Sequence, residues 1–200
     1  MERPDLVYHD GKPMLTDVTK KLFTTDEFHR MAEAGIFFDD NDRVELIDGE
    51  IIKMSPIGAR HMECVDRATT FFTEAFGRRA IVSVQSSLAL TKDTEPQPDI
   101  VILKPRPDFY RSKRRSPEDV LLMVEVSDTT LRYDQNVKLP RYAAAGISEV
   151  WIEDLTHNLL LVYREPAGDH FKTELTFRHG DSVSPLAFPE TIFKVDDLLG

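Results

Sequence analysis

Two nearly uninterrupted apolar runs decide the fold of this chain: Pro98-Asp-Ile-Val-Ile-Leu103 and Val120-Leu-Leu-Met-Val-Glu-Val126. Such runs are typical of sheet strands that are covered on both faces. Each run carries one carboxylate, Asp99 at the start of the first and Glu125 near the end of the second. If the two strands lie side by side and antiparallel, the start of one meets the end of the other, so Asp99 and Glu125 become neighbours.

The elements around these strands predict a mixed α/β domain. Apolar residues spaced three and four apart indicate a long amphipathic helix over residues 59–76. The pair Asp48-Gly49 between two apolar runs predicts a β-hairpin over residues 43–54. The other expected elements are a helix from Thr24 to Gly35, strands over 81–90, 99–103, 120–127 and 149–153, a helix over 131–145 in which Pro140 forms a kink or marks the true start, strands over 159–164 and 171–177, and a short helix over 195–199.

Length and composition fit one folded domain. The pattern leaves residues 1–22 as an N-terminal arm and residues 23–200 as a single domain of a 200-residue chain. A content of 41% hydrophobic and 30% charged residues is typical of soluble globular proteins. The net charge of −10 argues against a broad cationic surface that would coat nucleic acid or an anionic membrane.

Cysteine content and hydropathy predict a cytoplasmic protein without a membrane segment. The single cysteine, Cys64, cannot form an internal disulfide or a Cys-x-x-Cys zinc site. The N-terminus lacks the apolar core of a signal peptide, and no apolar run approaches the roughly 18 residues of a membrane span. The chain also lacks the GxSxG, GxxxxGK and GxGxxG motifs, so serine-hydrolase, P-loop and dinucleotide-binding chemistry are poorly supported.

The carboxylates of Asp99 and Glu125 suggest a cation site. Two close carboxylates repel each other and raise one pKa, unless a divalent cation lies between them. Hard oxygen ligands of this kind suit Mg²⁺ or Mn²⁺. The alternative is that each acid caps its strand and accepts hydrogen bonds from a backbone amide or an arginine.

Three further side chains could join this pair. Glu45, in the hairpin, is either a ligand or an edge residue turned to water, and the pattern alone favours the second. Lys138, four residues after Asp134, is either an exposed ion-pair partner or a cation directed at the two acids. His61, with Arg60 at the start of the long helix, could contact an anion, or could belong to a solvated helix start.

Residues 104–115 form the most basic segment, with six cations and one acid. Because the segment directly follows the Asp99 strand, we expect it to contact phosphates beside the acidic site, with Phe109-Tyr110 as stacking surfaces. The cations expected to contact a nucleic-acid backbone are Arg111, Lys113, Arg114 and Arg115. The alternative is a solvated, mobile loop.

Several motifs in this order resemble one known family. They are Glu45-Leu-Ile-Asp-Gly-Glu50, Arg60-His61, Glu95-Pro-Gln-Pro-Asp99, Val124-Glu-Val126, and Tyr133-Asp134 followed by Lys138-Leu-Pro-Arg-Tyr-Ala-Ala-Ala-Gly-Ile147. Together they resemble the Uma-two family of restriction-endonuclease-like proteins, over residues 24–199. That family belongs by fold to the PD-(D/E)xK nuclease superfamily. The resemblance therefore implies a restriction-endonuclease-like core of helix, three strands, helix and strand, with an N-terminal helix and β-hairpin and a β-rich C-terminal extension.

The resemblance also implies a metal-dependent endonuclease that hydrolyses phosphodiester bonds in DNA. Asp99 and Glu125 would hold Mg²⁺ (or Mn²⁺) and so activate a water for attack on phosphorus. The superfamily lysine would stand two residues after the second acid, where this chain has Ser127, and the resemblance offers Lys138 as its replacement. The rest of the implied site consists of Glu45 as an auxiliary acid, with His61 and Gln85 as lining residues.

The serine at position 127 leaves two other hypotheses open. One is a catalytically inactive module of nuclease fold that binds nucleic acid or protein. The other is a structural or interaction protein in which protein groups satisfy both acids. The direction of Lys138 distinguishes an active site from an inactive one. Because superfamily nucleases often dimerise, the resemblance also implies a homodimer.

Overall fold

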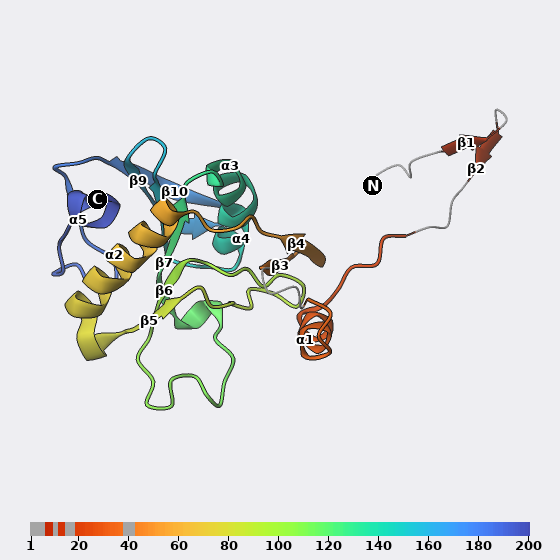
Figure 1. Ribbon diagram of the computed structural model, residues 1–200, viewed down its shortest axis with the longest axis horizontal. Coiled ribbons are helices and arrows are strands. Elements are labelled where there is room, and N and C mark those ends of the chain that lie inside the picture. Colours follow the sequence, from red (N-terminus) through yellow and green to blue (C-terminus); the bar gives the residue numbers. More distant parts are fainter. Residues whose placement is uncertain (1–6, 10–11, 15–18, 38–42) are drawn as a thin grey trace.

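The computed structural model describes residues 7–9, 12–14, 19–37 and 43–200 (Figure 1). Its centre is a six-stranded sheet in the order β10-β9-β8-β7-β6-β5. These strands are β5 (Ile81–Val84), β6 (Ile100–Leu103), β7 (Val120–Ser127), β8 (Glu149–Asp154), β9 (Leu159–Ala167) and β10 (His170–Phe177). Only β7 and β8 pair in parallel, and the other four pairs are antiparallel. The predicted α/β class with adjacent, antiparallel β6 and β7 is confirmed.

Helices cover both faces of the sheet, which explains the continuous apolar pattern of its central strands. On one face, α2 (Ala59–Phe76) packs against β5 and β7, and the short α5 (Val195–Leu199) packs against α2. The core there includes Phe72, whose ring centroid lies 6.1 Å from that of Trp151. On the other face, α4 (Leu139–Ala144) contacts β9 and β10.

The second helix of the core consists of three helical pieces. It begins with α3 (Leu131–Tyr133), continues through a π-helical turn over Asp134–Lys138 and ends as α4. Pro140 is the second residue of α4 and directly follows the π turn, so it lies where the helical hydrogen-bond pattern is already irregular. The helical segment begins at Leu131 and runs without a break, so Pro140 does not mark its true start. The π turn is the irregularity that the sequence pattern did not predict.

The N-terminal helix and hairpin also form as expected. Helix α1 (Thr25–Glu33) begins at a capping box in which the Thr24 hydroxyl accepts from the Glu27 amide and the Glu27 carboxylate accepts from the Thr24 amide. The hairpin consists of β3 (Val44–Ile47) and β4 (Glu50–Lys53). Gly49 in its turn has a φ of +76°, and a Cβ there would approach the Leu22 side chain to 2.7 Å. The turn therefore requires glycine.

One predicted strand differs from expectation. The strand expected over residues 81–90 ends at Val84, because Gln85 takes a positive φ of 45° and the chain leaves the sheet. Part of the expected N-terminal arm, residues 1–6, 10–11 and 15–18, lies outside the described residues.

No described helix is long and apolar enough to cross a membrane. The remaining elements are β1 (Val7–His9), β2 (Lys12–Met14), the 3-10 turns Gly77–Arg79 and Pro117–Asp119, β11 (Ser182–Val183) and β12 (Phe193–Lys194).

Candidate functional site

The strand register brings Asp99 and Glu125 together. Ile100 pairs with Val124, so Asp99, one residue before β6, lies level with Glu125 in β7. The Asp99 Oδ2 accepts a hydrogen bond from the Val126 amide at 2.9 Å. Both acids are buried. The two carboxylates therefore meet as the antiparallel pairing predicts.

Both acids line one small pocket of about 70 Å³ at this end of the sheet. The start of α2, the hairpin and the π turn contribute its other walls. The residues proposed from the sequence that line it are Glu45, His61, Asp99, Glu125 and Lys138. Gln85 does not line the pocket, but its side-chain amide lies 3.5 Å from the Asp99 Oδ1. The structure thus gathers most of the expected site residues around one cavity.

Glu45 does not turn to water, so the preferred interpretation of its position is wrong. Its side chain is only 1% exposed. The Glu45 Oε1 accepts from the Gln97 amide at 2.9 Å and lies 3.0 Å from the Lys138 Nζ. Its Oε2 is buried and has no partner among the described residues. Glu45 is buried because β3 joins the main domain through an antiparallel bridge between Leu46 and Glu95.

Lys138 is a buried cation rather than an exposed ion-pair partner. Its Nζ lies 3.0 Å from the Glu45 Oε1, 3.2 Å from the Glu125 Oε1 and 3.9 Å from the Asp134 Oδ1. Burial by itself lowers the pKa of a lysine, but these carboxylates outweigh it and raise the pKa of Lys138 above its ordinary value. Lys138 therefore points at the acids and keeps its proton.

The two central acids have opposite pKa shifts. Burial raises the pKa of Glu125 to about 8, and the charges of Asp134, Asp99 and Glu45 add to this effect against the opposing charge of Lys138. Burial acts to raise the pKa of Asp99, but the hydrogen bond and charge of His61, the Val126 amide and the charge of Lys138 together outweigh it and hold that pKa below its ordinary value. Asp99 is therefore the ionised member of the pair at neutral pH.

His61 in the first turn of α2 orients the Asp99 carboxylate. Its Nε2 lies 3.1 Å from the Asp99 Oδ2, and the side chain is only 13% exposed. A solvated helix start is therefore ruled out for His61. The neighbouring Arg60 turns elsewhere and donates to the Asn158 side chain at 3.0 Å. Arg60 and His61 do not act as a pair.

The sequence reasoning missed two buried groups. The Tyr142 hydroxyl on α4 donates to the Glu125 Oε1. Glu153 on β8 accepts from the Cys64 thiol, with the Sγ 2.7 Å from its Oε2, and its Oε1 is buried without a partner among the described residues. Burial raises the pKa of Glu153 to about 8. Its signal in the sequence was the same as that of Glu125, an acid near the end of an apolar strand.

The acids of the pocket suit a hard divalent cation. Glu45, Glu125 and Asp134 contact Lys138, and Asp99 lines the same pocket, so four acidic side chains share one lysine. No group of three or more His, Cys, Asp and Glu side chains in the described part of the chain is arranged to hold a metal ion. Mg²⁺, however, is usually bound through one or two carboxylates and keeps several waters. The Asp99–Glu125 pair, with the unpartnered Glu45 Oε2 nearby, fits that requirement.

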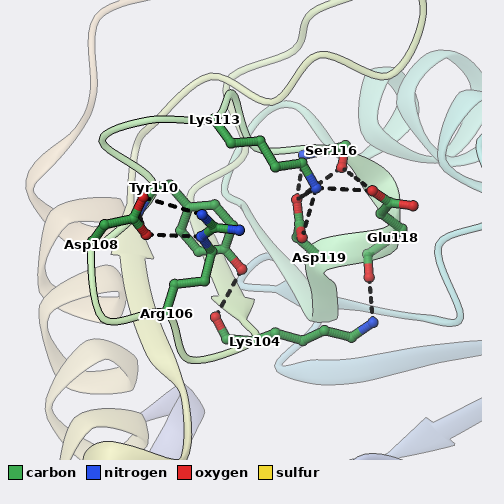
Figure 2. Close-up of polar contacts among 8 residues, drawn as sticks. All are labelled: Lys104, Arg106, Asp108, Tyr110, Lys113, Ser116, Glu118 and Asp119. Carbon is green, nitrogen blue, oxygen red and sulfur yellow. Dashed lines mark hydrogen bonds and ion pairs between the residues drawn. The ribbon is translucent and has the colours of Figure 1, made fainter.

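The basic segment forms no part of the acid pocket, which corrects the expected arrangement. It begins at the end of β6 opposite to Asp99, and none of its described residues lines the acid pocket. Its side chains bond largely to one another and to the following turn (Figure 2). The Arg106 Nε donates to the Asp108 Oδ1 at 2.9 Å, and the Lys113 Nζ lies 3.1 Å from the Asp119 Oδ2. Of the two expected stacking surfaces, Tyr110 is buried, whereas Phe109 is exposed.

Comparison with known proteins gives the family of the chain. The family Uma2, described as "Putative restriction endonuclease", matches residues 25–196. The crystal structure of "a putative nuclease belonging to DUF820" from Anabaena variabilis ATCC 29413 is similar in fold, with a TM-score of 0.67 and 17% identity over 88% of this chain and 97% of that chain. A search of curated proteins gave no match. Because the family match spans most of its length, the chain belongs to the Uma2 family, on a nuclease-like fold.

Proposed function

We propose that this protein is a metal-dependent endonuclease that hydrolyses phosphodiester bonds in DNA. The observation that carries the proposal is the meeting of Asp99 and Glu125 in one pocket, with the buried Lys138 directed at Glu125. The membership of the Uma2 family, whose description names restriction endonucleases, supports the reaction class.

In this proposal Asp99 and Glu125 hold Mg²⁺ or Mn²⁺. When bound, such an ion supplies Lewis-acid stabilisation of the phosphoryl oxygens and lowers the pKa of water. Asp99 is suited to this role because the Val126 amide and His61 hold its carboxylate ionised and fixed in orientation. Lys138 and Tyr142 both donate hydrogen bonds to the Glu125 Oε1, and these bonds fix the orientation of its carboxylate.

Lys138 would stabilise charge rather than transfer a proton. Its raised pKa keeps the ammonium group charged at neutral pH. A fixed positive charge in a water-poor pocket is worth more to a developing negative charge than the same charge in solvent. The superfamily places its lysine at the position that Ser127 occupies here. Lys138 therefore supplies electrostatic stabilisation from the helix that follows Ser127 instead.

Cleavage of supercoiled plasmid in Mg²⁺ and in Mn²⁺ tests the proposal. We expect the wild-type protein to nick or linearise the plasmid, and Asp99→Asn and Glu125→Gln to abolish cleavage. Glu118→Gln is a matched control, because Glu118 is an exposed acid that does not line the acid pocket. Equal activity of wild type and Glu125→Gln would overturn the mechanism.

One observation favours a second candidate, a nuclease-fold module that binds DNA without cutting it. The Glu125 Oε1 already accepts hydrogen bonds from both Lys138 and Tyr142, and Ser127 occupies the usual lysine position. This candidate predicts saturable binding of duplex DNA by a protein that leaves the plasmid intact in both metals.

A further inference from the structure

A second pocket, of about 260 Å³, adjoins the segment that leads to the acids. Glu95 lines this pocket and Gln97 lines the acid pocket, and both residues precede prolines that hold the segment extended. The Cα atoms of two such residues are about 6 Å apart in an extended chain. The two pockets are therefore near neighbours.

Three consecutive cations line the second pocket. They are Lys113, Arg114 and Arg115, and they share the pocket with His29, Ser86 and Ser87. In a chain with a net charge of −10, three adjacent cations around one cavity form an exceptional positive surface. Arginine and serine side chains are common donors to phosphate oxygens.

The loop that carries these cations is built to hold them in place. Phe109 and Tyr110 both take positive φ values, 49° and 65°, which reverse the chain so that Tyr110 enters the core. The Tyr110 hydroxyl donates to the Lys104 carbonyl at 2.8 Å (Figure 2). On the far side of the cations, the Asp119 carboxylate accepts from the Ser116 amide at 3.0 Å. Anchors on both sides fix residues 113–115 against the pocket.

Not all of this positive charge is neutralised within the protein. Lys113 is paired with Glu118 and Asp119. Arg114 contacts Asp26, and both of these side chains are exposed to solvent. The Arg115 Nη1 donates to the Ser83 Oγ at 2.6 Å. No carboxylate among the described residues forms an ion pair with Arg115.

Glu95, the one acid among the described residues that line this pocket, is shielded. Both oxygens of Glu95 lie 3.0 Å from the His29 Nε2. Since an ionised carboxylate only accepts hydrogen bonds, this nitrogen donates to Glu95. The Glu95 charge is thus directed at His29 rather than at the cations, which leaves Arg114 and Arg115 as the groups available to an anion.

We propose that this second pocket binds a backbone phosphate of the DNA strand whose scissile bond enters the Asp99–Glu125 pocket. This inference rests on the proposed function. It replaces the general contact expected of residues 104–115 by one phosphate position, held by Arg114 and Arg115 with Ser87 beside them in the pocket lining. Arg111 lines neither pocket and is not part of this position.

Binding of a short DNA duplex, measured against salt concentration in Ca²⁺ instead of Mg²⁺, tests the inference. The variants are Arg114→Gln/Arg115→Gln and the single variant Arg114→Gln, and the control Arg111→Gln removes one charge from the same loop, as Arg114→Gln does. We expect the double variant to bind roughly tenfold more weakly or worse, because it loses charged hydrogen bonds. Loss of one phosphate contact lowers the slope of log affinity against log salt by about 0.9, and the control keeps the wild-type slope.

A double variant that binds with the affinity and slope of the control would overturn the inference, as would a wild-type protein that binds no DNA. The single variant Arg114→Gln leaves the Ser83 contact intact and should change binding in the same direction. Plasmid cleavage separates this result from the proposed function. Reduced binding by the double variant, in a protein that never cleaves, supports the pocket and contradicts the nuclease. Cleavage by the wild type together with unchanged binding by the double variant supports the nuclease and contradicts the phosphate position in the second pocket.

Discussion

Replacement of Lys138 by methionine should destabilise the protein strongly. The variant keeps the length of the side chain but leaves Glu45, Glu125 and Asp134 without their shared cation. Breaking a buried ion pair by removing one partner costs about 3–5 kcal/mol of unfolding free energy. An exposed i,i+4 pair, the other interpretation of Lys138, contributes only a few tenths of a kcal/mol. The two interpretations therefore differ about tenfold in the expected loss.

The loss should also depend on pH. The Glu125 pKa of about 8 in the folded chain is above its ordinary value, so the folded state retains a proton that the unfolded state loses. Stability from this group is therefore complete at low pH and declines as pH rises towards about 8. Without the positive charge of Lys138, the ionised forms of these buried carboxylates are even less stable. The difference between variant and wild type should be smallest near pH 5 and largest above pH 8.

Urea unfolding followed by the fluorescence of Trp151 measures this difference, because Trp151 is the only tryptophan and is fully buried. Lys21→Met is a matched control, since Lys21 pairs with Glu27 at the surface and its loss should change stability little. The double variant Lys138→Met/Glu125→Gln should recover part of the loss. A Lys138→Met protein as stable as the Lys21→Met control at pH 8 would refute the reasoning.

Three further outcomes follow from the other buried groups. Glu153→Gln should melt at the wild-type temperature near pH 5 and above it near pH 9, because the folded state binds a proton at Glu153 up to about pH 8. A variant that melts at the wild-type temperature at both pH values contradicts this. Tyr142→Phe should lose about 1–3 kcal/mol by urea unfolding, since it removes a buried hydrogen bond to Glu125, and a neutral effect would show that bond to be unimportant. Native Cys64 should resist alkylation as followed by mass spectrometry, because burial and the neighbouring Glu153 raise the thiol pKa; rapid labelling would show the α2–β8 contact to be open.

The sequence was sufficient to predict the centre of the site. Asp99 and Glu125 each interrupt an apolar strand, and an ionised group in such a position needs a partner. Antiparallel pairing of the two strands then determines which partner it meets, and the observed register agrees. The motif resemblance added Lys138 and Glu45, which the residue pattern alone left open.

What the sequence could not predict depends on what covers each face. Alternation places Glu45 on one side of the hairpin, but only the Leu46–Glu95 bridge shows that this side is buried. In the same way, Glu153 looks like an ordinary strand end until Cys64, 89 residues away, is brought against it. The basic segment was misplaced because following Asp99 in sequence means lying at the opposite end of a four-residue strand.

Calorimetric titration of Mn²⁺ tests the central claim most directly, because it needs no knowledge of the substrate. Wild type, Asp99→Asn and Glu125→Gln are compared, with Glu118→Gln as the surface control. The account predicts saturable binding to wild type and to Glu118→Gln, and loss of that binding in both pocket variants. Saturable binding that persists in Asp99→Asn and Glu125→Gln, or its absence from wild type, would contradict a metal site at the meeting of β6 and β7.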